Sequence, residues 1–164
     1  MQKFGQLRDV RCAVIGSGGA AGAAVWVLRQ EGAKVGLFAR NAKSAESLAE
    51  KFGATSDSLE GAVFAGFDVV INATPLGTLG QFESETPATA HQLRGARLAY
   101  DLVYNPSLTK FLLEAREAGC ETLEGLSMLV AQAAEQFTLW TGEVAPESVM
   151  FDAAQRALGR RSAI

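Results

Sequence analysis

Histidine, cysteine and excess positive charge are scarce in this sequence. His91 is the single histidine among 164 residues, so histidine-based metal sites and Ser-His-Asp triads have almost no material. We expect His91 to be a solvated residue of a polar loop. Cys12 and Cys120 lie in apolar runs and are expected to be buried, reduced thiols. The net charge of −3 argues against general nucleic-acid binding, which depends on an excess of lysine and arginine.

Long apolar stretches are also missing. None reaches the ~18 apolar residues that a membrane helix needs, and the first nine residues are too polar for a signal peptide. We therefore expect a soluble, cytoplasmic protein without a membrane partner. Proline is scarce at 4 residues, whereas glycine reaches 17, which indicates tight turns and close backbone approaches.

Apolar runs alternate with helical patterns along the whole chain. Strands are expected at 11–15, 34–39, 67–72, 97–102 and 120–123, with a weak one at 54–56. Helices are expected at 19–31, 43–52, 107–118, 126–140 and 147–158, and residues 74–95 form a loop with one helical turn. Trp26 and Trp140 fall on apolar helix faces and are expected to pack. The alternation predicts an α/β fold, a doubly wound parallel sheet of Rossmann type in three α/β/α layers, as one domain over 1–164.

A glycine-rich loop follows the first strand. Its spacing is G-x-G-x-x-A, with Gly16, Gly18 and Ala21 at the three key places. Gly16 permits the turn out of the strand, Gly18 lets the backbone approach a pyrophosphate, and a small residue at 21 lets helix and strand pack closely. The helix that begins here directs unpaired N–H groups at phosphates. The motif lies inside a βαβ unit, which favours dinucleotide binding over a ligand-free turn.

The end of the second strand discriminates between cofactors. NAD-binding domains commonly carry an acidic residue there, whereas a 2′-phosphate requires positive charge. This strand ends in Ala39-Arg40-Asn41 with Lys43 close behind, and no carboxylate stands in the place. A guanidinium matches a phosphate in charge and geometry, so NADP is favoured over NAD. The alternative is that Arg40 is an ordinary surface charge.

Three further segments carry a family resemblance. They read VINATPLG at 70–77, YDLVYNP at 100–106 with Thr109 after it, and GLSMLVAQAA at 125–134. Together with the glycine loop, these segments resemble the C-terminal, NADP-binding half of shikimate dehydrogenases. The resemblance runs from about residue 12 to residue 142 and keeps the order of the motifs. Departures are Ala39-Arg40-Asn41 where the family usually has Asn-Arg-Thr, and Thr78 where Met is common.

The resemblance implies a role for each motif. The residues around the pyrophosphate would be Gly16, Ser17, Gly18, Gly19 and Ala20, and those around the 2′-phosphate Ala39, Arg40, Asn41, Lys43 and Ser44. The residues closing over the cofactor would be Asn72, Ala73, Thr74, Pro75 and Leu76, with Leu102, Gly125 and Met128 on the nicotinamide side. Tyr104 and Gln132 would reach the hydroxyls of shikimate. Gln132 stands four residues after Met128, on the same helix face.

The resemblance also implies a missing partner. In the family, a substrate domain with a catalytic Lys and Asp precedes the glycine loop, but only 15 residues precede Gly16 here. We therefore expect this chain to lack the N-terminal substrate domain and to hold no catalytic residue. Lys3 and Asp9 do not match the family's catalytic motifs. The expected chain is a cofactor domain excised from a longer enzyme, or a stand-alone relative.

The functional expectation is the NADP-binding half of a shikimate dehydrogenase, inactive in isolation. The whole enzyme would reversibly reduce 3-dehydroshikimate to shikimate with NADPH, in the synthesis of aromatic amino acids. One alternative is the cofactor domain of a related quinate/shikimate-type oxidoreductase, although an NAD-preferring quinate enzyme would carry an acid where Arg40 stands. A second alternative is a non-catalytic module that binds NADP(H).

Overall fold

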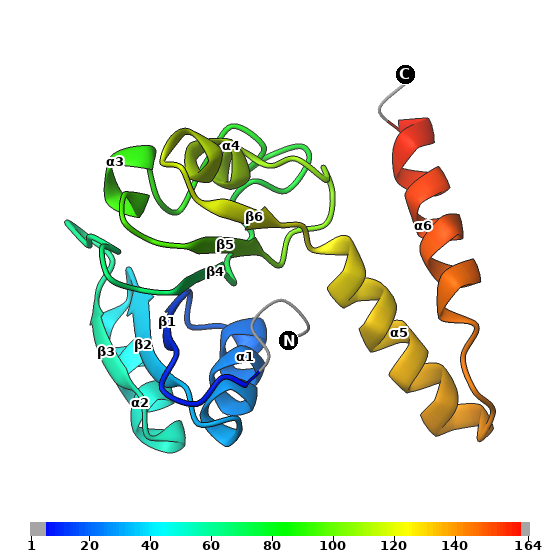
Figure 1. The fold of residues 1–164 in the computed structure, drawn as a ribbon, viewed down its shortest axis with the longest axis horizontal. Coiled ribbons are helices and arrows are strands. Elements are labelled where there is room, and N and C mark those ends of the chain that lie inside the picture. Colours follow the sequence, from blue (N-terminus) through cyan, green and yellow to red (C-terminus); the bar gives the residue numbers. More distant parts are fainter. Residues whose placement is uncertain (1–5, 162–164) are drawn as a thin grey trace.

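A computed structural model describes residues 6–161, which form a six-stranded parallel sheet with helices on both faces (Figure 1). The strands are β1 (Arg11–Ile15), β2 (Lys34–Ala39), β3 (Thr55–Ser58), β4 (Val69–Asn72), β5 (Leu98–Asp101) and β6 (Glu121–Leu123). Their order in the sheet is β3-β2-β1-β4-β5-β6, and each neighbouring pair is parallel. This order is that of the Rossmann fold, so the expected fold class is confirmed.

Two layers of helices cover the sheet. On one face lie α1 (Gly19–Gln30) and α2 (Ala42–Phe52), and on the other lie α3 (Ala90–Leu93) and α4 (Lys110–Glu117). Successive residues of β1 point to opposite cores, since Cys12 and Val14 pack with α1 whereas Ala13 and Ile15 pack with α4. Burial on both faces explains why the central strands read as continuous apolar runs.

A pair of helices extends from the last strand. The helices are α5 (Leu126–Thr141) and α6 (Glu147–Arg161), and α6 packs mainly on α5 (Figure 1). Leu139 and Val144 are among the most exposed apolar side chains of the described residues. The expectation that Trp140 packs is wrong, because 77% of it is exposed on α5, and Trp26 is 51% exposed on α1. An apolar helix face predicts burial only where another element covers that face.

The boundaries of several elements differ from the expected ones for identifiable reasons. β4 begins at Val69, two residues later than expected, and just before it the Asp68 carboxylate accepts a hydrogen bond from the backbone N–H of Arg11 at 2.9 Å. α4 begins at Lys110, because Thr109 is its N-cap and accepts a hydrogen bond from the backbone N–H of Leu112 at 3.3 Å. The weak strand is β3, an edge strand with all its residues exposed.

The single histidine and the two cysteines lie in ordinary structural positions. His91 is exposed, as expected, but it belongs to the short helix α3 and not to a loop. Cys12 and Cys120 are free and buried, which confirms the expectation of reduced core thiols. Within residues 6–161, no helix combines the length and the apolar character that crossing a bilayer requires.

Candidate functional site

A cavity of about 510 Å³ opens at the carboxyl ends of the strands. It lies where the chain order in the sheet reverses, between β1 and β4, which is the place where open α/β sheets bind ligands. Four segments line it: the loops after β1, β2 and β4, and the residue that follows the edge strand β3. The lining residues are Gly16, Ser17, Gly18, Ala39, Arg40, Asn41, Leu59, Ala73, Thr74, Pro75 and Leu76.

Gly16 lines the cavity directly after the end of β1. Its φ is +124°, and a Cβ there would stand 2.9 Å from the carbonyl oxygen of Ala73. The backbone N–H of Gly16 donates to Phe38 at 2.8 Å, and that of Ala73 donates to Ile15 at 2.9 Å. Glycine is therefore required here on two grounds, a left-handed backbone and the close approach of the loop after β4.

Gly18 faces open space instead. It is the N-cap of α1, its backbone is extended, and a Cβ added to it would meet nothing within 4 Å. No side chain caps this helix end. The first-turn N–H groups of a helix have no partner within the helix and carry its positive dipole end. An anion at this end of α1 would meet the helix N-terminus with no side chain in the way. Gly19 and Ala20 are exposed on the same turn.

The second wall comes from the end of β2. Arg40 is exposed and is the single charged residue among the described residues that line the cavity. Asn41 also lines it, while its side chain caps α2 by accepting the backbone N–H of Ser44 at 3.2 Å. Lys43 and Ser44 are exposed on the first turn of α2, outside the lining set. The wall is therefore positive and has no carboxylate, which suits a phosphate.

Leu59 is a lining residue that sequence reasoning missed. Its backbone N–H donates to the carbonyl of Ala39 at 3.2 Å, which holds the segment after β3 against the end of β2. β3 has the composition of a turn, and no motif follows it in the sequence. The contact depends on how the edge strand pairs, and that pairing leaves no local signal.

The third wall is ordered by a buried amide. Asn72 ends β4 and is fully buried. Its Oδ1 accepts the backbone N–H of Thr74 at 2.9 Å and the Thr74 hydroxyl at 2.7 Å. Its Nδ2 donates to the carbonyl of Leu76 at 3.1 Å and to a carboxylate oxygen of Asp101 at 2.9 Å. The side chain of Asn72 thus shapes the loop that lines the cavity, while Asn72 itself is fully buried and outside the lining set.

Asp101 is the buried acid behind that loop, and sequence reasoning did not select it. Its carboxylate accepts hydrogen bonds from Asn72, from the backbone N–H of Val103 at 2.9 Å and from the hydroxyl of Thr109. Burial raises the pKa of Asp101 to about 6, although the bonds from Thr109, Val103 and Asn72 act in the opposite direction. An acid at the carboxyl end of an apolar strand was the available signal.

The raised pKa of Asp101 predicts a pH dependence of stability. The folded chain holds the Asp101 proton up to about pH 6, whereas the unfolded chain releases it near 3.8. The stabilising contribution of this proton is complete below pH 3.8 and is lost as the pH rises through 6, by about 3 kcal/mol. Urea unfolding of the chain and of Asp101→Asn between pH 4 and 7 measures the difference. A constant difference between the two proteins would contradict the expectation.

The remaining predicted residues lie around the end of β5, outside the 510 Å³ cavity. Gly125 is buried, and a Cβ there would stand 2.6 to 2.8 Å from the carbonyl oxygens of Val103, Asp101 and Leu102. Only glycine lets α5 begin so close to β5. Leu102 is half-buried, and its N–H donates to the carbonyl of Asn72 at 3.0 Å.

The two predicted substrate contacts are accessible side chains. Tyr104 follows β5 and is 42% exposed, and Gln132 is exposed on α5. Met128, one turn before Gln132, is half-buried. The structure thus brings the predicted phosphate-binding motifs together around one cavity, and the predicted nicotinamide and substrate residues lie outside its lining.

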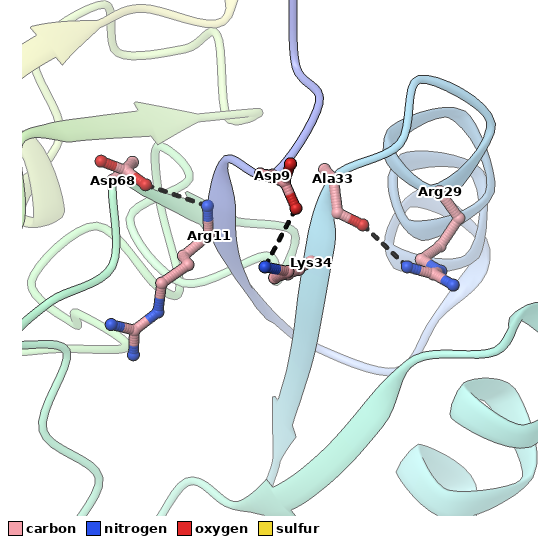
Figure 2. Close-up of polar contacts among 6 residues, drawn as sticks. All are labelled: Asp9, Arg11, Arg29, Ala33, Lys34 and Asp68. Carbon is pink, nitrogen blue, oxygen red and sulfur yellow. Dashed lines mark hydrogen bonds and ion pairs between the residues drawn. The ribbon is translucent and has the colours of Figure 1, made fainter.

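The amino ends of the strands, opposite the cavity, hold an ion pair and two hydrogen bonds (Figure 2). Asp9 lies 3.0 Å from the Lys34 ammonium, whose hydrogen bond and charge lower the pKa of Asp9. Arg29 donates to the carbonyl of Ala33 at 2.8 Å and so ties the last turn of α1 to the start of β2. Asp9 is therefore remote from the cavity, and Lys3 lies outside the described residues. Within those residues, no group of three His, Cys, Asp or Glu side chains could hold a metal ion.

Comparison with known proteins identifies the family of this chain. The family model described as shikimate / quinate 5-dehydrogenase matches residues 1–101, and that of the shikimate 5′-dehydrogenase C-terminal domain matches residues 125–155. The first match alone covers more than half of the chain. The chain belongs to the shikimate / quinate 5-dehydrogenase family.

Individual members of this family match most of the chain. A shikimate dehydrogenase (NADP⁺) of Oleidesulfovibrio alaskensis is 43% identical over 136 residues, which are 81% of this chain and 49% of the relative. A crystal structure of a shikimate dehydrogenase in complex with NADP⁺ superposes with a TM-score of 0.87 at 31% identity, over 96% of this chain and 57% of that one. The crystal structure of the Thermus thermophilus enzyme in complex with NADP(H) and shikimate superposes with a TM-score of 0.81 at 39% identity. The match covers 90% of this chain and 55% of that one.

The lengths of these relatives matter for function. The chain spans about half the length of the curated relatives that it matches. The similarity therefore describes one half of a dehydrogenase of this family, the half that contains the glycine loop and the parallel sheet.

Proposed function

We propose that this chain is the NADP-binding half of a shikimate dehydrogenase, an oxidoreductase that interconverts 3-dehydroshikimate and shikimate. One observation carries the proposal: the cavity at the switch point joins an open glycine N-cap to a wall whose single charged residue is Arg40. That combination accepts a dinucleotide with an extra phosphate on its adenosine ribose. The relatives named as NADP⁺-dependent support the same cofactor.

Each of three walls of the cavity would bind a different part of the cofactor. The first turn of α1, from Gly18 onward, would hold the pyrophosphate on backbone N–H groups. Arg40, with Lys43 and Ser44 beside it, would bind the 2′-phosphate, and the loop from Ala73 to Leu76 would close over the ligand. When bound, NADP supplies the hydride chemistry of the reaction. The protein holds and orients it.

The substrate site would be completed by the half of the enzyme that this chain does not match. Residues 1–164 would be one dinucleotide-binding domain, and an N-terminal substrate domain would supply the acid–base pair. Tyr104 and Gln132, both accessible, would reach the shikimate hydroxyls, and Met128 with Leu102 and Gly125 would border the nicotinamide. The exposed apolar residues of α5 and α6 support this proposal, because they leave a surface for a further domain to cover.

Two other functions remain distinguishable by experiment. A quinate-type enzyme of the same family would oxidise quinate faster than shikimate in an assay of the whole protein. A non-catalytic NADP(H)-binding module would bind the nucleotide and turn over neither acid. The absence of a carboxylate among the cavity's lining residues at the end of β2 favours an NADP-dependent enzyme. We propose that this enzyme acts in the cytoplasm, in the synthesis of aromatic amino acids.

The cofactor preference gives the first test of the proposal. The chain should bind NADP at least tenfold more tightly than NAD, because charge-assisted hydrogen bonds are worth roughly 1.5–3 kcal/mol each. Arg40→Ala should weaken NADP binding by that factor and leave NAD binding almost unchanged. Titration calorimetry with both nucleotides measures this. Arg94→Ala, which removes an exposed arginine beside α3, is the matched control and should change neither affinity. Equal binding of NAD and NADP by the parent chain would overturn the assignment.

A further inference from the structure

We propose that Asp101 is a positioning residue for the nucleotide cavity, acting through Asn72 to fix the loop of residues 73–76. The nature of the ligand rests on the proposed function, whereas the positioning itself concerns the chain without a ligand. Asp101 touches no part of the cavity, and its effect passes through one buried amide.

Every partner of the Asp101 carboxylate is a donor. Asn72 donates through Nδ2, and Val103 donates through its backbone N–H. The Thr109 hydroxyl accepts the backbone N–H of Leu112, which leaves its own proton directed at Asp101. A carboxylate is the one side chain of this size that accepts on both oxygens. The cluster therefore matches an ionised acid and matches an amide poorly.

Asp101 decides which end of the Asn72 amide faces the loop. Because the carboxylate holds Nδ2, the oxygen of Asn72 points at Thr74 and accepts both its N–H and its hydroxyl. The Thr74 hydroxyl in turn accepts the backbone N–H of Leu76 at 3.2 Å. A flipped amide would set an NH₂ group against the Thr74 N–H, so the loop would lose its acceptor. The wall formed by Thr74, Pro75 and Leu76 depends on that orientation.

Asp101 also connects the chain segments that follow β4 and β5. Thr109 packs against Gly77, where a Cβ would stand 3.1 Å from the threonine Cβ. The backbone N–H of Leu79 donates to the carbonyl of Asn105 at 2.9 Å. The end of β4, the loop after β5 and the N-cap of α4 therefore meet at Asp101, which accepts from one residue of each.

The groups around Asp101 are uncharged. Asn72 faces it from β4, Val103 from its own loop and Thr109 from α4, while Gly125 at the start of α5 meets its backbone carbonyl. The nearest titratable residues along the chain are Tyr100, whose pKa burial raises, and Tyr104, which is exposed. Lys110 on α4 donates to the carbonyl of Ser84 at 3.1 Å. Among the described residues, no charged neighbour contributes to the pKa shift of Asp101.

The test measures amide hydrogen exchange in the nucleotide-free chain. Asp101→Asn should lower the protection of the Thr74 and Leu76 amides about tenfold, the worth of one hydrogen bond to a charged group. Asp68→Asn is the control, because it converts a different, half-buried carboxylate, which accepts a backbone N–H and an arginine just before β4. In Asp68→Asn, the protection of the Thr74 and Leu76 amides should stay within about twofold of the parent's. Equal loss in the two variants, or no loss in Asp101→Asn, would overturn the proposal.

The pH profile separates positioning from general destabilisation. Local opening of the loop releases Asn72 while Asp101 stays buried, so the ionised carboxylate favours the closed loop. In the parent, the protection of Thr74 and Leu76 should therefore fall as the pH drops through about 6, opposite to the trend of the global stability, and in Asp101→Asn it should be flat. Thr109→Val removes a donor to the carboxylate and should move the inflection to higher pH, whereas Thr109→Ser keeps the donor and should not. These variants decide the question if Asp101→Asn does not fold. A parent profile without an inflection contradicts the proposal.

Nucleotide affinity links the cluster to the cavity. At pH 7.5, Asp101→Asn should weaken NADP binding about as many fold as it lowers the protection of the Thr74 and Leu76 amides. Asp68→Asn should leave NADP binding unchanged. The 2′-phosphate itself titrates near pH 6, so parent and variant are compared at one pH. If the parent binds no NADP, the proposed function fails, while the exchange experiment still decides the role of Asp101. Normal NADP affinity in Asp101→Asn despite lost protection would show that the loop does not shape the binding site.

Discussion

Gly18→Val is expected to abolish nucleotide binding while the chain folds normally. Gly18 has an extended backbone, and a Cβ at this position meets nothing within 4 Å, so valine adds neither strain nor a clash to the folded protein. Its branched side chain would occupy the open side of the glycine loop, where a pyrophosphate must approach the N–H groups of α1. Losing two charge-assisted hydrogen bonds there would lower the affinity about a hundredfold or more.

Calorimetry with NADP and a thermal melt of the same sample separate binding from folding. Gly159→Val is the control, since a Cβ at Gly159 also meets nothing within 4 Å and this glycine lies on α6, away from the cavity. Both variants should keep their cooperative melts, and only Gly18→Val should lose NADP. Normal NADP affinity in Gly18→Val would mean that the phosphates bind elsewhere.

The sequence predicts those parts of the site that lie close together along the chain. The glycine loop is such a part, because Gly16, Gly18 and Ala21 sit at fixed places between a strand and a helix. Arg40 is another, since the end of β2 lies beside the end of β1 in any sheet of this type. The cavity confirms that these two motifs meet. Here the rules of parallel-sheet topology turn separate motifs into a single prediction.

The parts that sequence reasoning missed depend on contacts between distant segments. Asp101 is one residue in an apolar strand, and its importance follows from Asn72, 29 positions earlier, and from Thr109. Leu59 reaches the cavity only because β3 pairs with β2. Trp26 and Trp140 show the reverse failure, since an apolar pattern predicts a buried face but cannot identify the element that covers it.

A polypeptide of these 164 residues alone is expected to give no measurable enzymatic turnover of shikimate. The described residues near the cavity offer no pair that could move a proton: Asp101 is buried and fully bonded, and His91 is exposed on α3. General acid–base catalysis is worth about 10²–10⁴-fold, and positioning of the substrate can be worth more. Holding shikimate by Tyr104 and Gln132 alone would supply neither acid–base catalysis nor positioning.

The measurement mixes the chain with NADP and millimolar shikimate and follows the absorbance of the reduced cofactor, with a complete dehydrogenase of the family as the positive control. NADP binding without turnover is the expected result. Substantial turnover that survives Gln132→Ala would show that the active site is complete within this chain and that no second domain is needed.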